Sequence, residues 1–217
     1  MMTSTTPDPA FHYFPENYRW SMGLLLCLSA APWGGAEIDE VHRVGQKLRD
    51  HVGDDQVWFQ EWAQMAAQLE EQGREAQERG YKETAASCLF RSAHYYQTGE
   101  RFLHPKSTSD LAGYGKSVAA FRDACEMISW PSVESVEVPY GDKSLPALFV
   151  HGDNRNNTPQ RPVMVFFDGF DVTKEIQYFK GIPDLARRGI SCLIVDGPGN
   201  GEAIRFRDLP LIAETED

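Results

Sequence analysis

Two loops that contain glycine carry the residue types of this chain that could do chemistry. Asp168-Gly169-Phe170-Asp171 follows the apolar run Val163–Phe167, and Asp196–Glu202 (DGPGNGE) follows a second apolar run, ISCLIVD. We expect both runs to be strands of one sheet, and ligand sites in open α/β sheets form at the carboxyl edge of such strands. Gly169 would allow close approach of the backbone, and the Phe170 N–H could donate a hydrogen bond to a negatively charged oxygen.

Both loops also have simpler interpretations. The spacing of the first loop favours an ordinary strand–helix connection in which Asp171 caps the helix. The second loop supplies Gly197 and Gly199 of a dinucleotide-binding G-x-G-x-x-G motif but has Glu202 in place of the last glycine. Because Pro210 interrupts the residues that follow, they are a poor helix start, and a tight turn with glycines at positive φ is favoured. A truncated dinucleotide-binding oxidoreductase is therefore a minor alternative, and we expect no cofactor.

The sequence contains no complete catalytic apparatus. It has no G-x-S-x-G and no S-x-x-K motif, and its six histidines form neither an H-x-x-x-H nor an H-E-x-x-H pair. The four cysteines are widely spaced without a C-x-x-C pair, which fits buried reduced thiols better than disulfides or a zinc site. We therefore expect no bound metal.

Helical periodicity dominates the chain up to Trp130-Pro131. Three segments repeat apolar side chains at helical spacing, over residues 55–79, about 82–102 and 110–129, and Asp54 or Asp55 can cap the first. We interpret the apolar stretch 21–31 as a buried helix, with a signal peptide as the minority interpretation. The third segment has a narrow seam that is typical of packing on another helix, formed by Leu111, Tyr114, Val118, Phe121, Cys125 and Ile128.

The pattern after Trp130-Pro131 predicts an α/β fold. Val133–Tyr140 and Leu145–His151 can pair as a hairpin. The continuous apolar run Val163–Phe167 indicates a strand buried on both faces. One helix, capped by Asp171 or Thr173, should connect it to the next strand and end near Arg188. A strand–helix–strand of this kind makes that part of the sheet parallel.

Composition and charge exclude several classes of protein. The 217 residues are 41% hydrophobic and 24% charged, which is ordinary for a globular protein and excludes disordered and low-complexity chains. Lys and Arg number 21 against 32 Asp and Glu, a net charge of -11. Because such a surface repels phosphate backbones and anionic membranes, we expect neither nucleic acid nor a membrane as a partner. We expect a cytoplasmic protein.

Four segments together resemble one branch of the α/β-hydrolases. They are residues 15–20 (PENYRW), 92–96 (SAHYY), 167–175 (FDGFDVTKE) and 196–202 (DGPGNGE). The branch includes 2,6-dihydroxypseudooxynicotine hydrolase, the fungal yellowish-green polyketide-shortening hydrolases and FrsA-like esterases. The resemblance covers nearly the whole chain. It implies a helical cap domain over residues 1–130 and the N-terminal half of a hydrolase core over residues 131–217, truncated after the fourth strand.

The resemblance implies a serine hydrolase that cleaves an ester, or a C–C bond next to a ketone, in an aromatic or polyketide-like small molecule. Its Ser–Asp/Glu–His triad begins at an elbow after a fifth strand. No residue here matches that triad, so we expect these 217 residues to be inactive alone. Gly169 and Phe170 match the oxyanion-hole loop, although Asp168 stands where many members have Gly. The predicted substrate-binding residues are Trp20, His94, Tyr95 and Asp171, and packing would explain the first three as well.

The resemblance also implies the strand order 1-2-4-3-5, which would leave Val163–Phe167 on an open edge. An exposed apolar edge invites pairing with another chain. The partner that we expect is the missing C-terminal hydrolase half or a second copy of the chain. A non-catalytic helical binding or interaction module is the alternative from another functional class, because the helical hairpins are somewhat like tetratricopeptide units.

Overall fold

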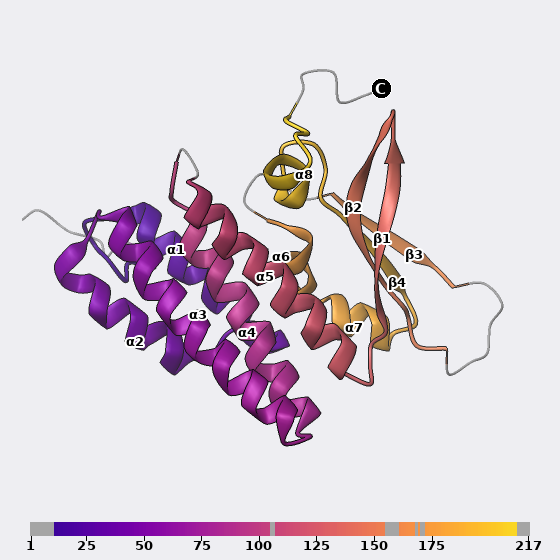
Figure 1. Cartoon of the computed structure of the whole chain (residues 1–217), viewed down its shortest axis with the longest axis horizontal. Coiled ribbons are helices and arrows are strands. Elements are labelled where there is room, and N and C mark those ends of the chain that lie inside the picture. The colour runs from indigo at the N-terminus through magenta and orange to yellow at the C-terminus, as the bar shows by residue number, and fades with distance from the viewer. Residues whose placement is uncertain (1–10, 105–106, 155–160, 168, 170–171, 212–217) are drawn as a thin grey trace, which may run out of the picture.

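The computed structural model describes residues 11–104, 107–154, 161–167, 169 and 172–211. Helices come first along the chain, and strands begin only after Met127 (Figure 1). The helices are α1 (Tyr18–Leu28), η1 (Ala31–Trp33), α2 (Ile38–Leu48), η2 (Arg49–His51), α3 (Asp55–Glu78), α4 (Lys82–Glu100), α5 (Thr108–Met127), α6 (Lys174–Tyr178), α7 (Ile182–Arg187) and α8 (Gly201–Phe206). The strands are β1 (Val133–Tyr140), β2 (Lys143–Val150), β3 (Val163–Phe167) and β4 (Ser191–Val195).

The predicted helices of the N-terminal region are present. The Asp54 carboxylate caps α3 by accepting hydrogen bonds from the backbone N of Gln56 at 3.0 Å and of Val57 at 3.2 Å. Trp58 and Trp62, spaced at i and i+4, are fully buried as their periodicity predicts. α5 begins at Thr108, two residues before the predicted start of the segment 110–129. Among the described residues no helix is both long and apolar enough to cross a membrane.

The helix α4 is central to this helical region. Every residue from Ser92 to Glu100 is buried, so both polar and apolar sides of the helix face other elements. α3 and α5 are its main neighbours in the helical region. Because polar side chains such as Gln97 and Glu100 are enclosed, they need partners from other parts of the chain.

The four strands form one mixed sheet in the order β1-β2-β4-β3. β1 and β2 pair as the predicted antiparallel hairpin, with Tyr140 opposite Lys143 around a turn in which Gly141 has φ +58°. β2 pairs antiparallel with β4, and β3 pairs parallel with β4. The parallel pair confirms the predicted strand–helix–strand unit, and the order matches the first four strands expected from the resemblance.

The connection between β3 and β4 differs from the prediction of one helix. It forms two short helices, α6 and α7, separated where Gly181 has φ +94° and Pro183 stands in the first turn of α7. Proline has no N–H to donate and its ring would clash with the preceding turn, so it can begin a helix but does not continue one. Thr173, one of the two predicted caps, begins α6 by accepting a hydrogen bond from the Ile176 N at 3.4 Å.

The residues after Glu202 also differ from the prediction. They form α8, although the sequence there is a poor helix start. Asn200 begins this helix, and its side chain accepts a hydrogen bond from the Gly201 N at 2.8 Å. Pro210 lies four residues beyond the last helical residue, Phe206, so it limits the helix without preventing it.

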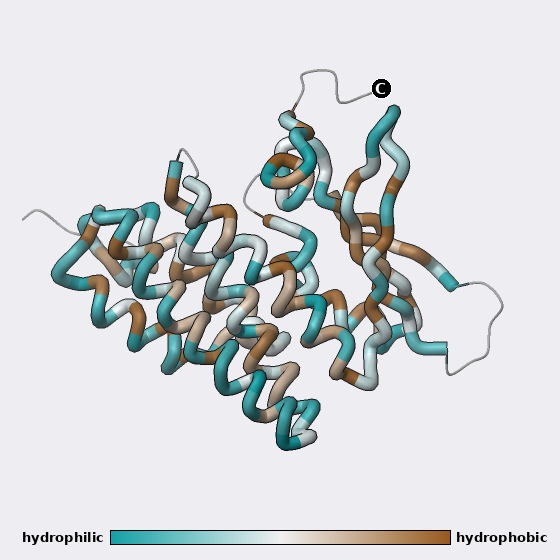
Figure 2. Tube along the Cα trace, in the orientation of Figure 1, coloured by the Kyte–Doolittle hydropathy of each residue, from teal (hydrophilic) through white to brown (hydrophobic). Residues whose placement is uncertain are grey.

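β3 is not buried on both faces, contrary to the prediction. Val163, Val165 and Phe167 are 51%, 50% and 66% exposed. β3 is one of the two edge strands of the sheet, with β1 at the other edge, and it pairs only with β4 among the described strands. Its Phe166 packs against the main core. Met164, whose side chain points to the other face, is also 41% exposed. The apolar run, which is mostly brown in Figure 2, therefore marks an edge strand that the described residues leave largely exposed.

One continuous apolar core joins the helical region to the sheet. Figure 1 shows α6 and α7 between the helical bundle and the strands. Phe90 of α4 and Phe121 of α5 pack against Tyr178 and Phe179, with ring centroids 5.3–5.8 Å apart. Leu148, Val150, Cys192 and Ile194 complete this core from the sheet. Alternate residues of β2 and β4, including Ala147 and Val195, form a smaller cluster with Ala203 of α8.

Candidate functional site

A buried ionic cluster joins the two loops that follow β3 and β4. The Lys174 Nζ lies 2.6 Å from Glu175 Oε1, 3.0 Å from Asp196 Oδ2 and 3.5 Å from Glu202 Oε1. The side chain of Lys174 is 5% exposed and that of Asp196 is 0% exposed. Removing charges from water costs several kcal/mol per ion, so a cluster this deep depends on all of its partners.

The Asp196 carboxylate also binds backbone groups of both loops. It accepts hydrogen bonds from the Lys174 N at 2.7 Å and from the Glu202 N at 3.0 Å. Gly201 has φ +46°, and a Cβ at this position would overlap the Asp196 carboxylate. Glycine is therefore required there both for its conformation and for its lack of a side chain.

The cluster has an excess of negative charge. Burial alone would lower the pKa of Lys174, but the carboxylates of Glu175, Asp196 and Glu202 raise it above its usual value, so the ammonium stays charged. Burial would raise the pKa of Glu175, yet the neighbouring ammonium brings it below its usual value. For Asp196 and Glu202 burial prevails over Lys174, and both pKa values are raised. The Lys174 ammonium therefore stabilises the charged form of Glu175 more than it stabilises the charged forms of Asp196 and Glu202.

The second loop is a turn, as the favoured interpretation states. Gly199 and Gly201 have φ +84° and +46°, whereas Gly197 does not have a positive φ. The Asn200 Nδ2 donates a hydrogen bond to the Val172 carbonyl at 2.6 Å, which is a further link to the first loop. The glycines thus allow the chain to turn around the Asp196 carboxylate.

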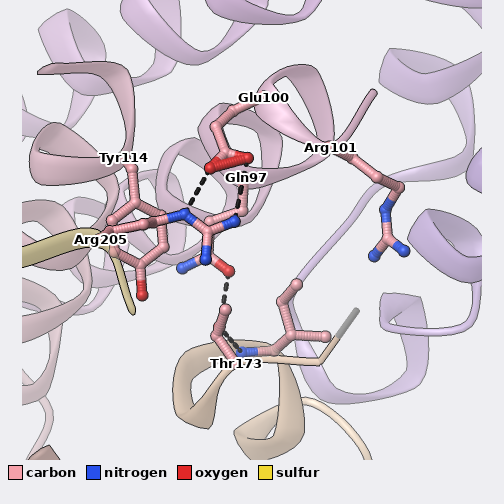
Figure 3. A pocket seen from close by; sticks show the side chains of 7 residues that line it. Gln97, Glu100, Arg101, Tyr114, Thr173 and Arg205 are labelled. Carbon is pink, nitrogen blue, oxygen red and sulfur yellow. Dashed lines mark hydrogen bonds and ion pairs between the residues drawn. The ribbon is translucent and has the colours of Figure 1, made fainter. Parts of the chain in front are cut away.

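Polar side chains of the helical region meet these loops at a small niche (Figure 3). The Thr173 hydroxyl donates to Gln97 Oε1 at 2.6 Å, and Gln97 Nε2 donates to Glu175 Oε2 at 3.3 Å. The Arg205 guanidinium donates to Glu100 from Nε at 2.5 Å and from one terminal nitrogen at 3.2 Å. The niche encloses about 30 Å³ and is lined by Gln97, Glu100, Arg101, Tyr114, Thr173, Ile176 and Arg205.

A larger groove reaches the ionic cluster between α5 and the β1–β2 hairpin. Its volume is about 410 Å³, within the range of small-molecule sites. Phe121, Cys125 and Leu148 contribute to its apolar wall, and Lys174 and Glu202 reach it from the cluster. In the part of the chain that the structure describes, no group of three or more His, Cys, Asp or Glu side chains is arranged to hold a metal ion.

Of the predicted oxyanion-hole loop, Gly169 is described. It is exposed, a Cβ there would meet no atom within 4 Å, and its carbonyl accepts a hydrogen bond from the Val172 N at 3.2 Å. Phe170 and Asp171 lie outside the described residues, as does Asp168. The role of this loop in an oxyanion hole therefore stays a prediction.

The other predicted substrate-binding residues lie inside the helical region. The Trp20 Nε1 donates to Asp55 at 2.9 Å, and the Tyr95 hydroxyl donates to Glu40 at 2.7 Å. The Gly35 carbonyl, 2.8 Å from His94 Nδ1, can only accept, so this histidine donates from Nδ1. Burial lowers the pKa of His94 to about 4. None of the three lines the niche or the groove. These contacts favour the packing explanation.

Several residues of the niche were not singled out as site residues by the sequence analysis. Gln97 and Glu100 lie on α4, and Arg205 belongs to the segment that was interpreted as a poor helix start. Tyr114 was expected only as part of a packing seam. The sequence pattern that could have identified this region is the pair of segments FDGFDVTKE and DGPGNGE. They contain Thr173, Lys174, Glu175, Asp196 and Glu202.

The chain is similar over most of its length to fungal hydrolases. It is 31% identical over 219 residues to hydrolase acrC of Aspergillus aculeatus, and this alignment covers 95% of the chain and 50% of that protein. It is also 31% identical over 196 residues to 20-hydroxy-prefusarin hydrolase FUS2 of Gibberella moniliformis, covering 88% of the chain and 46% of that protein.

The fold has a counterpart among solved structures. The 2,6-dihydroxy-pseudo-oxynicotine hydrolase superposes with a TM-score of 0.65 at 19% identity, covering 82% of this chain and 48% of that one. No family model matches the chain. The chain spans about half the length of the curated relatives and of the solved structure that it matches.

Proposed function

We propose that this chain, which corresponds in sequence and fold to the N-terminal portion of an α/β-hydrolase, forms the cap and the first four strands of a serine hydrolase. The substrate is an aromatic or polyketide-like small molecule, and the bond cleaved is an ester or a C–C bond next to a ketone. One observation supports this proposal most. At the niche, side chains of the helical region bind residues of the segments that follow the carboxyl ends of β3 and β4. Ligand sites in α/β sheets form at this edge.

In this function the chain supplies a hydrogen-bond donor for the substrate and a cluster of charged residues that positions the donor loop. The loop at Gly169 would offer a backbone N–H to the oxygen that becomes negative when a nucleophile attacks a carbonyl, and such a donor accelerates catalysis about 10²–10³-fold. The Lys174 cluster holds the end of that loop against the loop after β4 through the contacts of Asp196 with both. The serine nucleophile, the acid and the base come from strands that are not among these 217 residues.

Labelling with a fluorophosphonate, which reacts with activated serines, tests the proposal. The coding DNA should first be read beyond the codon for Asp217, and the 217-residue chain and its in-frame extension should be produced side by side. We expect the extension to contain G-x-S-x-G, to be labelled at that serine and to hydrolyse an aryl ester. We expect the 217-residue chain to remain unlabelled.

Other results would support the alternatives. A stop codon after Asp217, with no separate chain that restores labelling when it is mixed in, would contradict a hydrolase and favour the binding module. Binding of a nicotinamide cofactor to the purified chain would favour the oxidoreductase. Labelling of the 217-residue chain itself would contradict the claim that its nucleophile lies elsewhere.

A further inference from the structure

The groove between α5 and the β1–β2 hairpin has apolar walls that a small molecule can reach. On α5 it is lined by Val118, Phe121 and Cys125, which follow one another at helical spacing. Val118 and Cys125 are partly exposed, so their side chains are accessible in the groove. On the hairpin, Ser135 stands opposite Leu148 and both line the groove. Because an α-helix rises about 1.5 Å per residue, this wall of α5 is about 10 Å long, the length of an aromatic ring with a short chain.

Four of the charged side chains that line the groove are compensated by one another or by water. The Arg207 guanidinium contacts both carboxylate oxygens of Glu137, one of them at 2.8 Å. Arg122 and Glu126 on α5 carry opposite charges, and both are exposed, so water solvates them. These groups therefore add no net charge to the groove, and none of them needs a further partner.

Glu202 is the partly buried carboxylate of the groove, and its counter-ion is shared. Its side chain is 15% exposed, so it is reachable from the groove that it lines. Its polar side-chain partner among the described residues is the Lys174 ammonium, 3.5 Å from Oε1, which lies nearer to Glu175 and Asp196. Burial raises the pKa of Glu202 despite this ammonium. One positive charge is thus divided among three carboxylates, and this end of the groove stays negative.

We propose that the groove binds a small organic ammonium ion with an apolar body, and that the ammonium donates a hydrogen bond to the Glu202 carboxylate. The apolar body lies between α5 and the hairpin, against Val118, Cys125 and Leu148. An ammonium suits this end of the groove because it supplies both a positive charge and the donors that a carboxylate accepts. The proposal goes beyond the proposed function and does not rest on it, since every residue that it uses belongs to the described chain.

Three probes that share one phenylpropyl body test the charge of the ligand. Phenylpropylamine is an ammonium at neutral pH, phenylpropanol is neutral and phenylpropionate is an anion. Calorimetric titration into the purified 217-residue chain gives the dissociation constant of each, and the amide NMR signals that shift locate the bound probe. The same titrations are made with the in-frame extension of the chain, which shows whether the groove stays open in the longer protein.

Three variants separate the charge of Glu202 from the shape of the groove. Glu202→Gln removes the charge and keeps the size of the side chain. Glu126→Gln is the matched control, because it removes an exposed carboxylate that lines the same groove. Ser135→Trp places a large side chain at an exposed position of the hairpin wall and should fill the space of the apolar body. Melting temperatures of the variants show whether each one is folded.

We expect phenylpropylamine to bind the wild type and Glu126→Gln equally. Its dissociation constant should rise at least about tenfold in Glu202→Gln, the effect of one hydrogen bond to a charged group. Phenylpropanol should bind the wild type more weakly than the amine does, and phenylpropionate should bind most weakly of the three. Ser135→Trp should abolish binding of the amine. In the wild type the amide signals of Ser135, Leu148 and Glu202 should shift when the amine is added.

Several results would overturn the site. No binding of the amine to the wild type would do so, as would equal affinity of the amine for the wild type and folded Glu202→Gln. Phenylpropionate or phenylpropanol that binds the wild type as tightly as the amine would overturn the ammonium assignment, and this comparison needs no variant. Binding that is lost in the in-frame extension would show that further residues of the chain cover the groove. Serine labelling of the wild-type extension is read separately, so failure of this site and failure of the proposed function are distinguishable.

Discussion

Lys174 is the residue on which the geometry of both loops depends. Its ammonium contacts three carboxylates, and its backbone N donates to one of them, so a single residue links α6 to the loop after β4. A buried charge is tolerated when its partners remain, and removal of one partner leaves the others uncompensated. The cluster is therefore sensitive to single substitutions in a way that surface ion pairs, such as Arg43 with Asp39, are not.

Replacing Lys174 by methionine should destabilise the fold by about 3–5 kcal/mol at neutral pH, because the buried carboxylates of Glu175 and Asp196 and the partly buried one of Glu202 lose their counter-ion. Without the ammonium the folded state holds protons on these carboxylates more tightly than the unfolded state does. Stability of the variant should therefore recover relative to the wild type as the pH falls from 7 toward 5. Urea unfolding at several pH values measures both effects. Lys82→Met, at an exposed position, is the control.

His94 should make stability depend on pH in the acid range. Its pKa is lowered by burial to about 4, and Arg101 and Lys180 add to the lowering while the Gly35 carbonyl opposes it. The unfolded state binds a proton near pH 6.5, so the contribution of His94 is fully present above pH 6.5 and is lost as the pH falls toward 4. His94→Gln keeps a donor for Gly35 and should show a shallower loss of stability over this window. Equal slopes in both proteins would contradict the assignment.

At the scale of elements, the two short loops and the helices α6 and α8 act as one unit. Thr173 and Asn200 begin the helices, and Asp196 accepts hydrogen bonds from the backbone of both. Gly201 is the point of closest approach, since the Asp196 carboxylate occupies the space where a side chain would stand. The unit holds one wall of the niche in place against α4.

Gly201→Ala should disrupt this unit by more than backbone strain alone. Gly80→Ala is the matched control, because Gly80 also has a positive φ, +81°, but a Cβ there would meet no atom within 4 Å. We expect the control to lose about 1 kcal/mol of stability from strain. Gly201→Ala should lose at least about 2 kcal/mol more, since Asp196 must leave its hydrogen bonds. Thermal or urea unfolding of both variants gives the difference, and equal losses would show that the carboxylate adapts without cost.

At the scale of the whole molecule, the helical region and the sheet share one core, while no described strand pairs with the outer side of β3. Phe167, at the carboxyl end of β3, is 66% exposed beside the loop proposed to bind the substrate oxygen. A strand edge offers unpaired backbone groups, and apolar side chains along it favour pairing with another strand. This edge is where we propose that the C-terminal half of a hydrolase, or otherwise a second copy, would add to the sheet.

Self-association of the purified chain should therefore depend on β3. We expect the wild type to form dimers or larger species at tens of micromolar, as measured by light scattering after size-exclusion chromatography. The double variant Val165→Lys and Phe167→Lys should be monomeric, because charges on an edge strand oppose edge-to-edge pairing. Ile38→Lys, which replaces a residue that is 70% exposed on α2, should behave as the wild type does. A monomeric wild type would contradict association through this edge.

Local patterns in the sequence were enough to place most of the elements. The spacing of Trp58 and Trp62 predicts α3, and the two apolar runs predict a parallel pair of strands, because periodicity and β-propensity act over a few neighbouring residues. The glycines of DGPGNGE predict a turn for the same reason. The family signature in these loops identified the segments that hold the site.

Only the tertiary structure brought the niche together. Gln97 meets Glu175 across 78 residues and Glu100 meets Arg205 across 105 residues, contacts that no local pattern encodes. Tyr114 follows the same apolar spacing as Phe121, and only the folded chain shows that its hydroxyl has no hydrogen-bond partner among the described residues. The residues of β3 likewise do not determine how exposed the strand is, because the burial of a strand depends on which elements lie beside it. The sequence determined the pieces of this site, and long-range packing decided which of their polar groups meet and which are left unpaired.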